Sequence, residues 1–388
     1  MTLKGRTWDR IRRPSTQPNK RRSLSNAYSP RGKLLREAAP LTDIQSREAM
    51  FSSLKKLIVC TTLAVGVLFV IELGCRFLEP GPIRFVDEFP YTPDQTLGQL
   101  HQPGFEGAWR GSHFGINSLG LRGPEPRDPS TPGVYRVLCL GSSLTYGAGV
   151  ADEDSWPRLL EEHLAVRMPE REVEVLNLGV RGWNSEHYLE AWRRFGVDLV
   201  PDLVILEFSL HDLPGVRELL MEVPFPEPTP SDGLFSKLSR AAVVRHFRAE
   251  WRHRGHEARM EELNSKVNVA LEDWRPEGGS SLREGIAELV EEIRATNAHP
   301  ALLCFPSEFQ VRIAEADRSP QGSLGMICAG LDVPYYAVGP TFRQYLAERS
   351  SLRPAVFLRG DLFHPNRKGH ELISLELFIS LEHSGVLP

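Results

Sequence analysis

The sequence predicts an α/β protein with a parallel β-sheet, preceded by one membrane-spanning helix. From residue 134 onward, short apolar runs alternate with segments of helical periodicity, the pattern of βαβ units. One run, Leu203–Phe208, is apolar apart from a single Glu, as expected for a strand covered on both faces. A third observation is an apolar segment that follows a basic N-terminal region. With 388 residues, the chain has room for at most two domains plus tails.

Residues 1–54 are predicted to form a basic, disordered cytoplasmic tail. They are rich in Arg, Ser and Pro and lack sustained periodicity. Residues 1–56 hold 14 Lys/Arg against 4 Asp/Glu, whereas the rest of the chain holds 32 against 46. Such a tail can bind nucleic acid, but it is equally typical of the cytoplasmic side of a membrane protein. We expect no nucleic-acid partner.

Residues 55–78 are predicted to be a transmembrane anchor. The uncharged run from Leu57 to Ile71 is short for a bilayer, but extension to Leu78 gives about twenty-two residues, which suffices. Lys55 and Lys56 flank the inner end. The alternatives are a core helix of a soluble domain and a cleaved signal peptide. We expect a single-pass protein of the inner membrane, with its N-terminus in the cytoplasm and its C-terminal domain in the periplasm.

Residues 79–130 are dense in Pro and Gly and are predicted as a coil-rich juxtamembrane segment. Within this segment, Asn117, Gly120 and Arg122 follow the spacing Asn-x-x-Gly-x-Arg. One interpretation is a turn at Asn117 and Gly120 with Arg122 in an ion pair. The other is that Arg122 binds an anionic substrate.

Residues 131–388 are predicted to form the α/β domain. The expected strands are Val137–Leu140, Glu172–Leu178, Leu203–Phe208, Ala301–Phe305 and Val333–Val338. The expected helices start near Ser155 and at Asn184 or Ser185, and cover Leu282–Thr296, Leu324–Leu331 and Lys368–Leu381. An insertion at about 213–280 breaks this alternation. It carries a basic helical segment from Ser236 to about Trp274 whose Arg and Glu residues interleave, as on a solvated face.

A hydroxyl pair follows the first strand of this domain. Gly141 ends the strand, and Ser142 and Ser143 come directly after it. The carboxyl end of a central strand, next to a helix start, is where open α/β sheets bind their ligands. A serine here either caps the helix or acts as a nucleophile.

A second polar group lies near the C-terminus, where Asp361 precedes His364 by three residues. Serine becomes a strong nucleophile only when a base takes its proton, and the base needs a third group to fix its tautomer. Asp-x-x-His alone is common. Together with a strand-end serine far upstream, it supports the hypothesis of a catalytic triad.

These two blocks resemble those of the SGNH, or GDSL-type, hydrolases. Gly141-Ser-Ser-Leu-Thr145 is similar to the first block of that family, and Asp361-x-x-His364 to the last. The resemblance covers roughly residue 133 to the C-terminus. It implies a flavodoxin-like three-layer α/β/α sandwich, the SGNH hydrolase fold, with Ser143 as nucleophile, His364 as base and Asp361 as orienting acid.

The resemblance also implies an oxyanion hole, which stabilises the negative oxygen formed in acyl transfer. Its expected donors are the N–H groups of Ser143 and Gly182, with Gly179 as the alternative glycine. Asn184, which opens the next helix, is a candidate substrate-binding residue. The third block, Ser209-Leu210-His211-Asp212, places His211 where the family has Asn, and Ser142 stands where the family usually has Asp. His211 is therefore either a replacement donor or a structural loop residue.

The function that we expect is a serine esterase of the cell envelope, acting on acyl esters such as O-acetyl groups of a glycan or lipid. The alternatives are an acyltransferase onto an envelope glycan and a non-catalytic relative that binds a glycan or a partner protein. No cofactor or metal is expected, since the His residues show no ligand spacing such as His-Glu-x-x-His. The five Cys residues indicate neither a disulfide framework nor a zinc site.

Overall fold

The computed structural model describes residues 39–78, 91–109, 112–213, 215–221, 256–272, 280–314, 316, 318–348, 356–358 and 361–388. Residues 1–38 of the predicted tail lie outside these stretches. So does most of the predicted insertion at 213–280, of which residues 213, 215–221, 256–272 and 280 are described.

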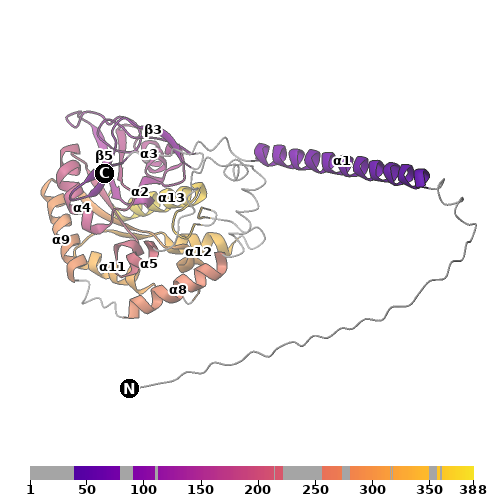
Figure 1. Ribbon diagram of the computed structural model, residues 1–388. Coiled ribbons are helices and arrows are strands. Elements are labelled where there is room, and N and C mark those ends of the chain that lie inside the picture. The colour runs from indigo at the N-terminus through magenta and orange to yellow at the C-terminus, as the bar shows by residue number, and fades with distance from the viewer. Residues whose placement is uncertain are drawn as a thin grey trace, which may run out of the picture. The chain divides into compact units, whose positions relative to one another are not determined.

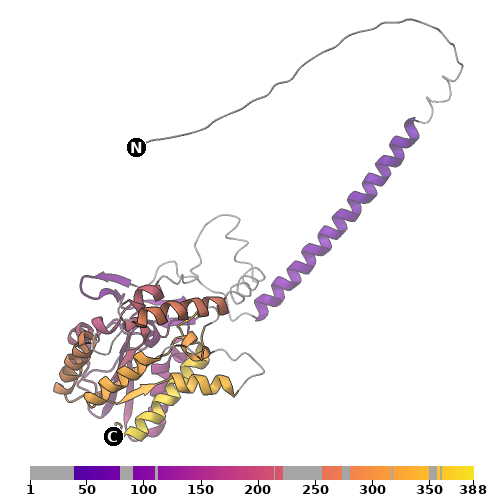
Figure 2. The ribbon, with the colours of Figure 1, turned by 90° about the horizontal axis from the view of Figure 1, so that it is seen from below.

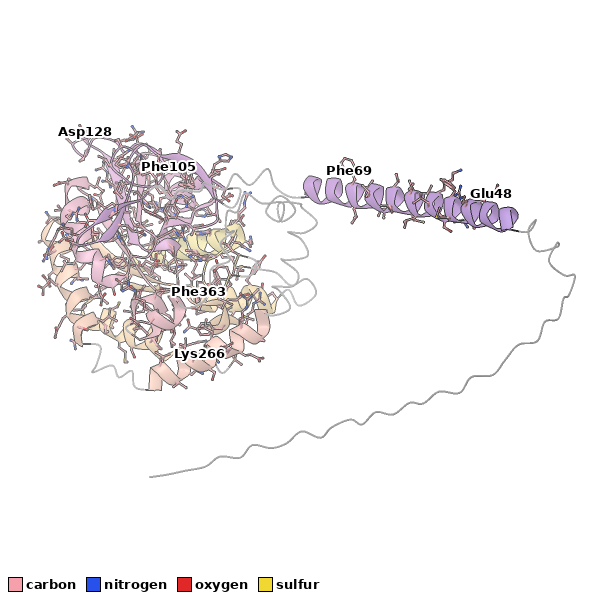
Figure 3. The ribbon with its side chains drawn as sticks, in the orientation of Figure 1. Glu48, Phe69, Phe105, Asp128, Lys266 and Phe363 are labelled. Atoms are coloured by element: carbon pink, nitrogen blue, oxygen red, sulfur yellow. The ribbon has the colours of Figure 1, made fainter. Side chains whose placement is uncertain are left out.

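Helix α1 spans Ala39–Leu78 and contains the predicted anchor. Its stretch Arg47–Val70 is long and apolar enough to cross a membrane, and none of it is buried within the protein. Phe69, for example, projects from the helix (Figure 3) and is 65% exposed. The helix starts well before residue 55, so the prediction of a disordered tail is wrong for residues 39–54. Helical hydrogen bonding extends from the apolar segment back into these polar residues.

A five-stranded parallel sheet forms the centre of the folded domain. Its strands are β5 (Val134–Gly141), β6 (Glu172–Gly179), β7 (Leu203–Phe208), β8 (His299–Cys304) and β9 (Tyr335–Ala337). They lie in the order β6-β5-β7-β8-β9, and every neighbouring pair is parallel. Strand β5, which leads to Ser142 and Ser143, is therefore interior, and all eight of its residues are buried. The predicted parallel sheet is confirmed.

Helices cover both faces of this sheet, which gives the predicted three-layer α/β/α sandwich (Figures 1 and 2). Their bounds are α2 Ser143–Tyr146, α3 Trp156–Arg167, α4 Ser185–Ala191, α5 Val216–Met221, α8 His256–Glu272, α9 Ser280–Ala295, α10 Glu308–Arg312, α11 Ser319–Gly330, α12 Gly339–Ala347 and α13 Arg367–Ser384. Short 3-10 turns occur at Asp152–Asp154, Val197–Leu199 and Leu210–Asp212, and a π-helical turn at Trp192–Gly196.

Alternate side chains of the strands feed two separate cores. On one face, Leu138 and Leu140 of β5 pack with residues of α4, α8, α9 and α11. On the other face, Val137 and Cys139 pack with residues of α3, α12 and α13. Because both faces are covered, the strands read as continuous apolar runs in the sequence.

The segment predicted as coil-rich, residues 79–130, contains two antiparallel hairpins. Strand β1 (Tyr91–Asp94) pairs with β2 (Gly98–His101), and β3 (Glu106–Trp109) pairs with β4 (Ser112–Gly115). An isolated bridge between Arg122 and Asn177 joins the end of this segment to strand β6. The Pro and Gly residues that predicted coil thus belong partly to turns between short strands, and these strands belong to the folded domain.

Candidate active site

The hydroxyl pair lies at the junction of strand β5 and helix α2, at the carboxyl edge of the sheet. Ser142 is the N-cap of α2, and its Oγ accepts from the N–H of Leu144 at 3.3 Å. Ser143 is the first residue of the helix, so its own N–H has no partner within the helix. Gly147, in the left-handed conformation, ends α2 after a single turn. The sequence left a helix cap and a nucleophile open for this pair. Ser142 is the helix cap, and the Ser143 hydroxyl contacts His364.

His364 meets Ser143 across this edge. The His364 Nε2 and Ser143 Oγ atoms are 2.8 Å apart, although the two residues are 221 positions apart in sequence. His364 lies in the loop that leads into α13, and this loop is fixed by hydrogen bonds of Leu358 N–H to His364 O and of Asn366 Nδ2 to Phe357 O. His364 is 3% exposed, so its ring is held by packing as well.

Asp361 lies on the opposite side of the imidazole. Its Oδ2 is 2.9 Å from His364 Nδ1, and its Oδ1 accepts from the N–H groups of Phe363 and His364. Burial raises the pKa of Asp361, but the charge of His364 and these hydrogen bonds outweigh it and hold that pKa below its usual range. An ionised carboxylate at Nδ1 selects the tautomer in which Nε2 can accept the Ser143 proton.

Glu207 is a functional candidate that our sequence reasoning did not identify. It belongs to β7, is 2% exposed and accepts four hydrogen bonds from residues of the turn between β5 and α2. The donors are the N–H of Ser142 at 2.9 Å, the N–H of Thr145 at 2.8 Å, the Oγ1 of Thr145 at 2.6 Å and the Oγ of Ser142. Burial raises the pKa of Glu207 above its usual value, and the hydrogen bonds, which lower it, offset only part of this shift. The signal in the sequence was its charge, the only one in an otherwise apolar strand.

The two candidate glycines lie at the end of β6: Gly179 is its last residue, and Gly182 lies in the loop that follows. A Cβ at Gly179 would overlap the backbone N of Tyr146, so this glycine allows the loop to pack directly against α2. Gly182 has φ +83°, in the left-handed region that favours glycine. The two candidates therefore differ in role: Gly179 provides the close approach, and Gly182 provides the turn that leads to Trp183.

His211 lies in the 3-10 turn after β7, next to the histidine loop. Its ring makes an edge contact with Phe363 at a centroid distance of 5.0 Å, and its Nδ1 is 3.4 Å from Ser209 Oγ. Burial and the charge of His364 lower the pKa of His211 to about 4. At neutral pH its imidazole is uncharged and carries one N–H.

Asp212, the closing residue of the third block, holds the loops together from below. Its Oδ1 accepts from the N–H of Ser185 at 2.6 Å, and its Oδ2 accepts from the N–H of Ser209 at 2.7 Å. Burial and the neighbouring Glu207 raise the pKa of Asp212 to about 7 despite these hydrogen bonds. It joins the turn that carries His211 to the start of α4.

Asn184 occupies the N-cap of α4, as its position at the helix start suggested. Its backbone N–H donates to His187 Nδ1 at 3.1 Å, and its side chain accepts from the backbone N–H of His187, which forms a capping box. Asn184 is 4% exposed, and its side-chain amide donates to Glu186. These contacts describe a capping residue, and the structure adds no contact with Ser143 or His364.

Arg122 is not available to an anionic substrate. Its side chain is 2% exposed, and Nε pairs with Asp152 at 2.6 Å. Its two remaining nitrogens donate to the carbonyl groups of Tyr146, Gly147 and Val150. The interpretation of Arg122 as a substrate-binding residue is therefore wrong, and the alternative, an ion pair, is what the structure shows. The hydrogen bonds of its guanidinium to the carbonyl groups fix the loop after α2.

Among the residues that the structure describes, no group of three or more His, Cys, Asp or Glu side chains could hold a metal ion. Cys139, Cys304 and Cys328 are free, buried thiols. Burial raises the pKa of Cys304 and of Cys328 to about 12. These thiols are protonated at neutral pH and are unsuited to metal binding or nucleophilic attack.

The fold and the family comparison define the class of protein, a hydrolase that acts on ester bonds. The model of the GDSL-like lipase/acylhydrolase family matches residues 139–372, more than half of the 388-residue chain. The chain belongs to this family. The matched range includes Ser143, Gly182, His211 and His364, and it begins after both N-terminal hairpins. None of the curated proteins matches the chain.

Solved structures with a similar fold include several esterases. An α/β hydrolase enzyme, LAE5, from the metagenome of Lake Arreo, Spain, has 17% identity and a TM-score of 0.41, covering 68% of this chain and 100% of its own. A two-domain esterase active on acetylated mannans has 18% identity and a TM-score of 0.40, covering 64% and 49%. A catalytic mutant of an acetylxylan esterase from Geobacillus stearothermophilus has 13% identity and a TM-score of 0.39, covering 64% and 94%.

Proposed function

We propose that the chain is a serine esterase in which Ser143, His364 and Asp361 form the catalytic triad. The observation that carries this proposal is the 2.8 Å contact between Ser143 Oγ and His364 Nε2, with Asp361 at 2.9 Å on the other ring nitrogen. This is the order nucleophile, base and orienting acid that acyl transfer requires.

The proposed reaction proceeds through two acyl-transfer steps. Ser143 Oγ attacks the ester carbonyl while His364 Nε2 takes the hydroxyl proton, and His364 then protonates the leaving alcohol oxygen. Water, deprotonated by the same imidazole, attacks the acyl-serine, and the imidazolium returns the proton to Ser143 Oγ as the acid is released. Asp361 stays ionised throughout and stabilises the imidazolium that forms in each step.

We propose that the N–H groups of Ser143 and Gly182 bind the developing oxyanion, and that His211 adds a third donor. The position of Ser143 at the start of α2 leaves its N–H free of helical bonds. Because its pKa is lowered, His211 is neutral at pH 7 and can donate its one N–H to the oxyanion. A neutral ring also places no second positive charge beside the imidazolium of His364. Loss of one such donor costs about 10²–10³-fold in kcat in known enzymes.

We further propose that α1 anchors the enzyme in the inner membrane with residues 79–388 in the periplasm. The support is the length and apolar composition of Arg47–Val70 and the excess of Lys and Arg before it. At this location the substrate would be an acyl ester of the cell envelope, and an O-acetyl ester on a glycan or lipid is the first class to assay. The protein should remain in membranes washed with alkaline carbonate and be released by detergent. Recovery in the soluble fraction would refute the anchor.

Hydrolysis of p-nitrophenyl acetate by the detergent-purified full chain tests the proposed activity. We expect turnover by the wild type and a loss of at least about 10³-fold in His364→Gln, because Gln cannot take the Ser143 proton. His383→Gln, at the exposed end of α13, is the matched control and should keep wild-type turnover. A folded wild type without turnover on acetyl, butyryl and glycan O-acetyl esters would favour a non-catalytic binding role, and acyl transfer to a sugar in preference to water would favour the acyltransferase.

A further inference from the structure

The first N-terminal hairpin, β1–β2, contacts both helix α2 and the loop that carries Gly182. It lies outside the range matched by the family model, which begins at residue 139. Tyr91 and His101, at the two open ends of its strands, stack on each other at 5.3 Å. His101 also contacts the ring of Tyr146 in α2 at 5.1 Å. One edge of the hairpin thus rests against the helix that carries Ser143.

The other part of the hairpin is bonded to the loop that carries Gly182. Gln99 Nε2 donates to the carbonyl oxygen of Arg181, the residue directly before Gly182. The indole N–H of Trp183, directly after Gly182, donates to the carbonyl oxygens of Leu97 at 3.0 Å and Gln99 at 3.1 Å. Both chain neighbours of Gly182 are therefore fixed by the hairpin.

The turn of the hairpin is stabilised by its own hydrogen bonds and is attached to the rest of the domain. Asp94 Oδ1 accepts from the N–H groups of Thr96 and Leu97, and the same carboxylate forms a two-point ion pair with Arg194 at 2.9 and 3.0 Å. Leu97 is 1% exposed and lies in the same core cluster as Trp183. The hairpin is thus docked by an ion pair and an apolar side chain on the segment that follows the Gly182 loop.

We propose that hairpin β1–β2 positions the Gly182 N–H for the oxyanion, with Gln99 as the positioning residue. This inference rests on the proposed function. The Gly182 loop turns through a left-handed glycine, and within the loop Trp183 N–H bonds Val180 O at 3.2 Å. The amide of Gln99 would lie 3.5 Å from a Cβ at Gly182, close enough to set the orientation of the adjacent peptide. An oxyanion donor must be placed within a few tenths of an ångström, so a loop of this kind gains from an external support.

The test compares Gln99→Met with wild type in the full chain, using p-nitrophenyl acetate. Met keeps the volume of Gln but cannot donate to Arg181 O. We expect kcat to fall about 10-fold with KM changed less than 2-fold, because a displaced donor affects the transition state more than the bound ester. Gln102→Met is the matched control, since Gln102 is exposed and follows the hairpin. Wild-type kcat in Gln99→Met would overturn the inference.

A second variant separates positioning from a general loss of structure. In Gln99→Glu an ionised carboxylate faces the Arg181 carbonyl, whereas the protonated form can donate to it. We expect the ratio of variant to wild-type kcat to be lowest near pH 8 and to rise as the pH falls towards 5. A ratio that does not change with pH, together with a lowered Tm, would mean that Gln99 is only structural. If Ser143→Ala retains full activity, the proposed function itself fails, and this outcome is distinct from both results at Gln99.

Discussion

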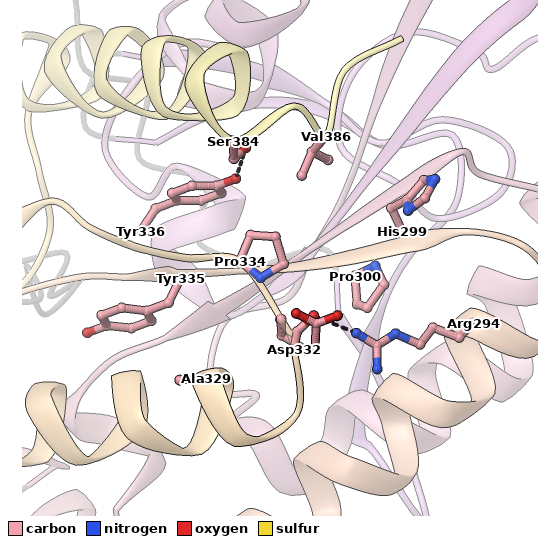
Figure 4. A pocket seen from close by; sticks show the side chains of 11 residues that line it. Arg294, His299, Pro300, Ala329, Asp332, Pro334, Tyr335, Tyr336, Ser384 and Val386 are labelled. Atoms are coloured by element: carbon pink, nitrogen blue, oxygen red, sulfur yellow. Dashed lines mark hydrogen bonds between the residues drawn. The ribbon is translucent and has the colours of Figure 1, made fainter.

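A serine and a histidine lie at each edge of the parallel sheet, but the two serines have different hydrogen-bond partners. At the carboxyl edge, Ser143 Oγ and His364 Nε2 are 2.8 Å apart. At the amino edge, a cavity of about 810 Å³ is lined by His299 and Ser384 among other residues (Figure 4). There the Ser384 hydroxyl donates to the carbonyl oxygen of Leu381 and is 2.7 Å from the hydroxyl of Tyr336.

The contacts at the two edges are the reason why we place the proposed active site at the carboxyl edge, although a cavity lies at the amino edge. At the carboxyl edge, strands lead into helix N-termini, so side chains and free N–H groups converge on one point. At the amino edge the cavity is bordered by the end of α9 and the starts of β8 and β9, where Arg294 bonds the carbonyl oxygens of Leu331 and Asp332. The serine hydroxyl there bonds a backbone carbonyl, which cannot act as a base.

Replacing the serine at each edge gives the largest expected contrast. Ser143→Ala should lower kcat/KM for p-nitrophenyl acetate about 10⁵-fold, since removal of a nucleophile disables the whole triad. Ser384→Ala should stay within 2-fold of wild type, because Ser384 bonds only groups of the amino edge. Equal activities of the two variants would remove the distinction between the edges.

Asp361→Asn should have the next largest effect, a fall in kcat of about 10⁴-fold. The substituted amide would favour the wrong tautomer of His364, while the packing around the loop would be preserved. Steady-state kinetics together with a circular dichroism spectrum would check this. A folded Asp361→Asn protein with more than a tenth of the wild-type kcat would show that the third group is dispensable.

Glu207→Gln tests the support beneath the nucleophile. The N–H groups of Ser142 and Thr145 both donate to Oε2, whereas the Ser142 hydroxyl donates to Oε1. Gln has one acceptor oxygen, so if that oxygen keeps the two N–H groups, the buried Ser142 hydroxyl loses its acceptor. We expect a loss of about 1–3 kcal/mol in the free energy of unfolding and a fall in kcat of about 10- to 100-fold. Glu106→Gln, at an exposed position of β3, is the control. Unchanged kcat and Tm in Glu207→Gln would mean that α2 is positioned by packing alone.

The raised pKa of Asp212 predicts a pH dependence of stability. Its ordinary pKa is 3.8, and in the folded protein it is about 7, so between these values the folded state holds a proton that the unfolded state releases. Raising the pH across this window therefore favours unfolding. The Tm of wild type relative to Asp212→Asn should fall from about pH 4 to about pH 7 and then level off. A constant difference for Asp212→Asn would contradict the raised pKa.

The smallest expected effect comes from filling the amino-edge cavity. Ala329 lines it and is exposed, so Ala329→Phe places a ring in the cavity without disturbing the core. We expect kcat and KM within 2-fold of wild type. A substantial rise in KM would assign a substrate-binding role to this cavity and weaken the comparison between the edges.

Much of the fold could be predicted because the sheet is buried on both faces. β7 has the predicted bounds of Leu203–Phe208, and β6 extends the predicted strand by one residue to Gly179. The hairpins could not be predicted, since β1 (Tyr91–Asp94) and β2 (Gly98–His101) have no apolar alternation and are stabilised by tertiary contacts such as that of Leu97 with the core. Helix α12 was missed because Gly339 and Pro340 at its start are typical of a turn.

The proposed site was predictable where the residue type carries the chemistry. Ser143, His364 and Asp361 were candidates from their side chains and spacing, and the structure brings these three together. Glu207 and Gln99 were missed because their roles depend on neighbours distant in sequence. At Arg122 the sequence left a substrate ligand and an ion pair open, and the structure shows the ion pair, with Asp152. The partner could not be predicted, because Asp152 lies 30 positions away in the sequence.

The most direct test of Ser143 as the nucleophile is to treat the full-length protein with a fluorophosphonate and locate the adduct by peptide mass spectrometry. We expect one adduct, on Ser143, that is absent from Ser143→Ala and forms much more slowly in His364→Gln, while Ser384→Ala labels like wild type. A folded protein that remains unlabelled, or that carries its adduct on another serine, would contradict the assignment of Ser143 as the nucleophile.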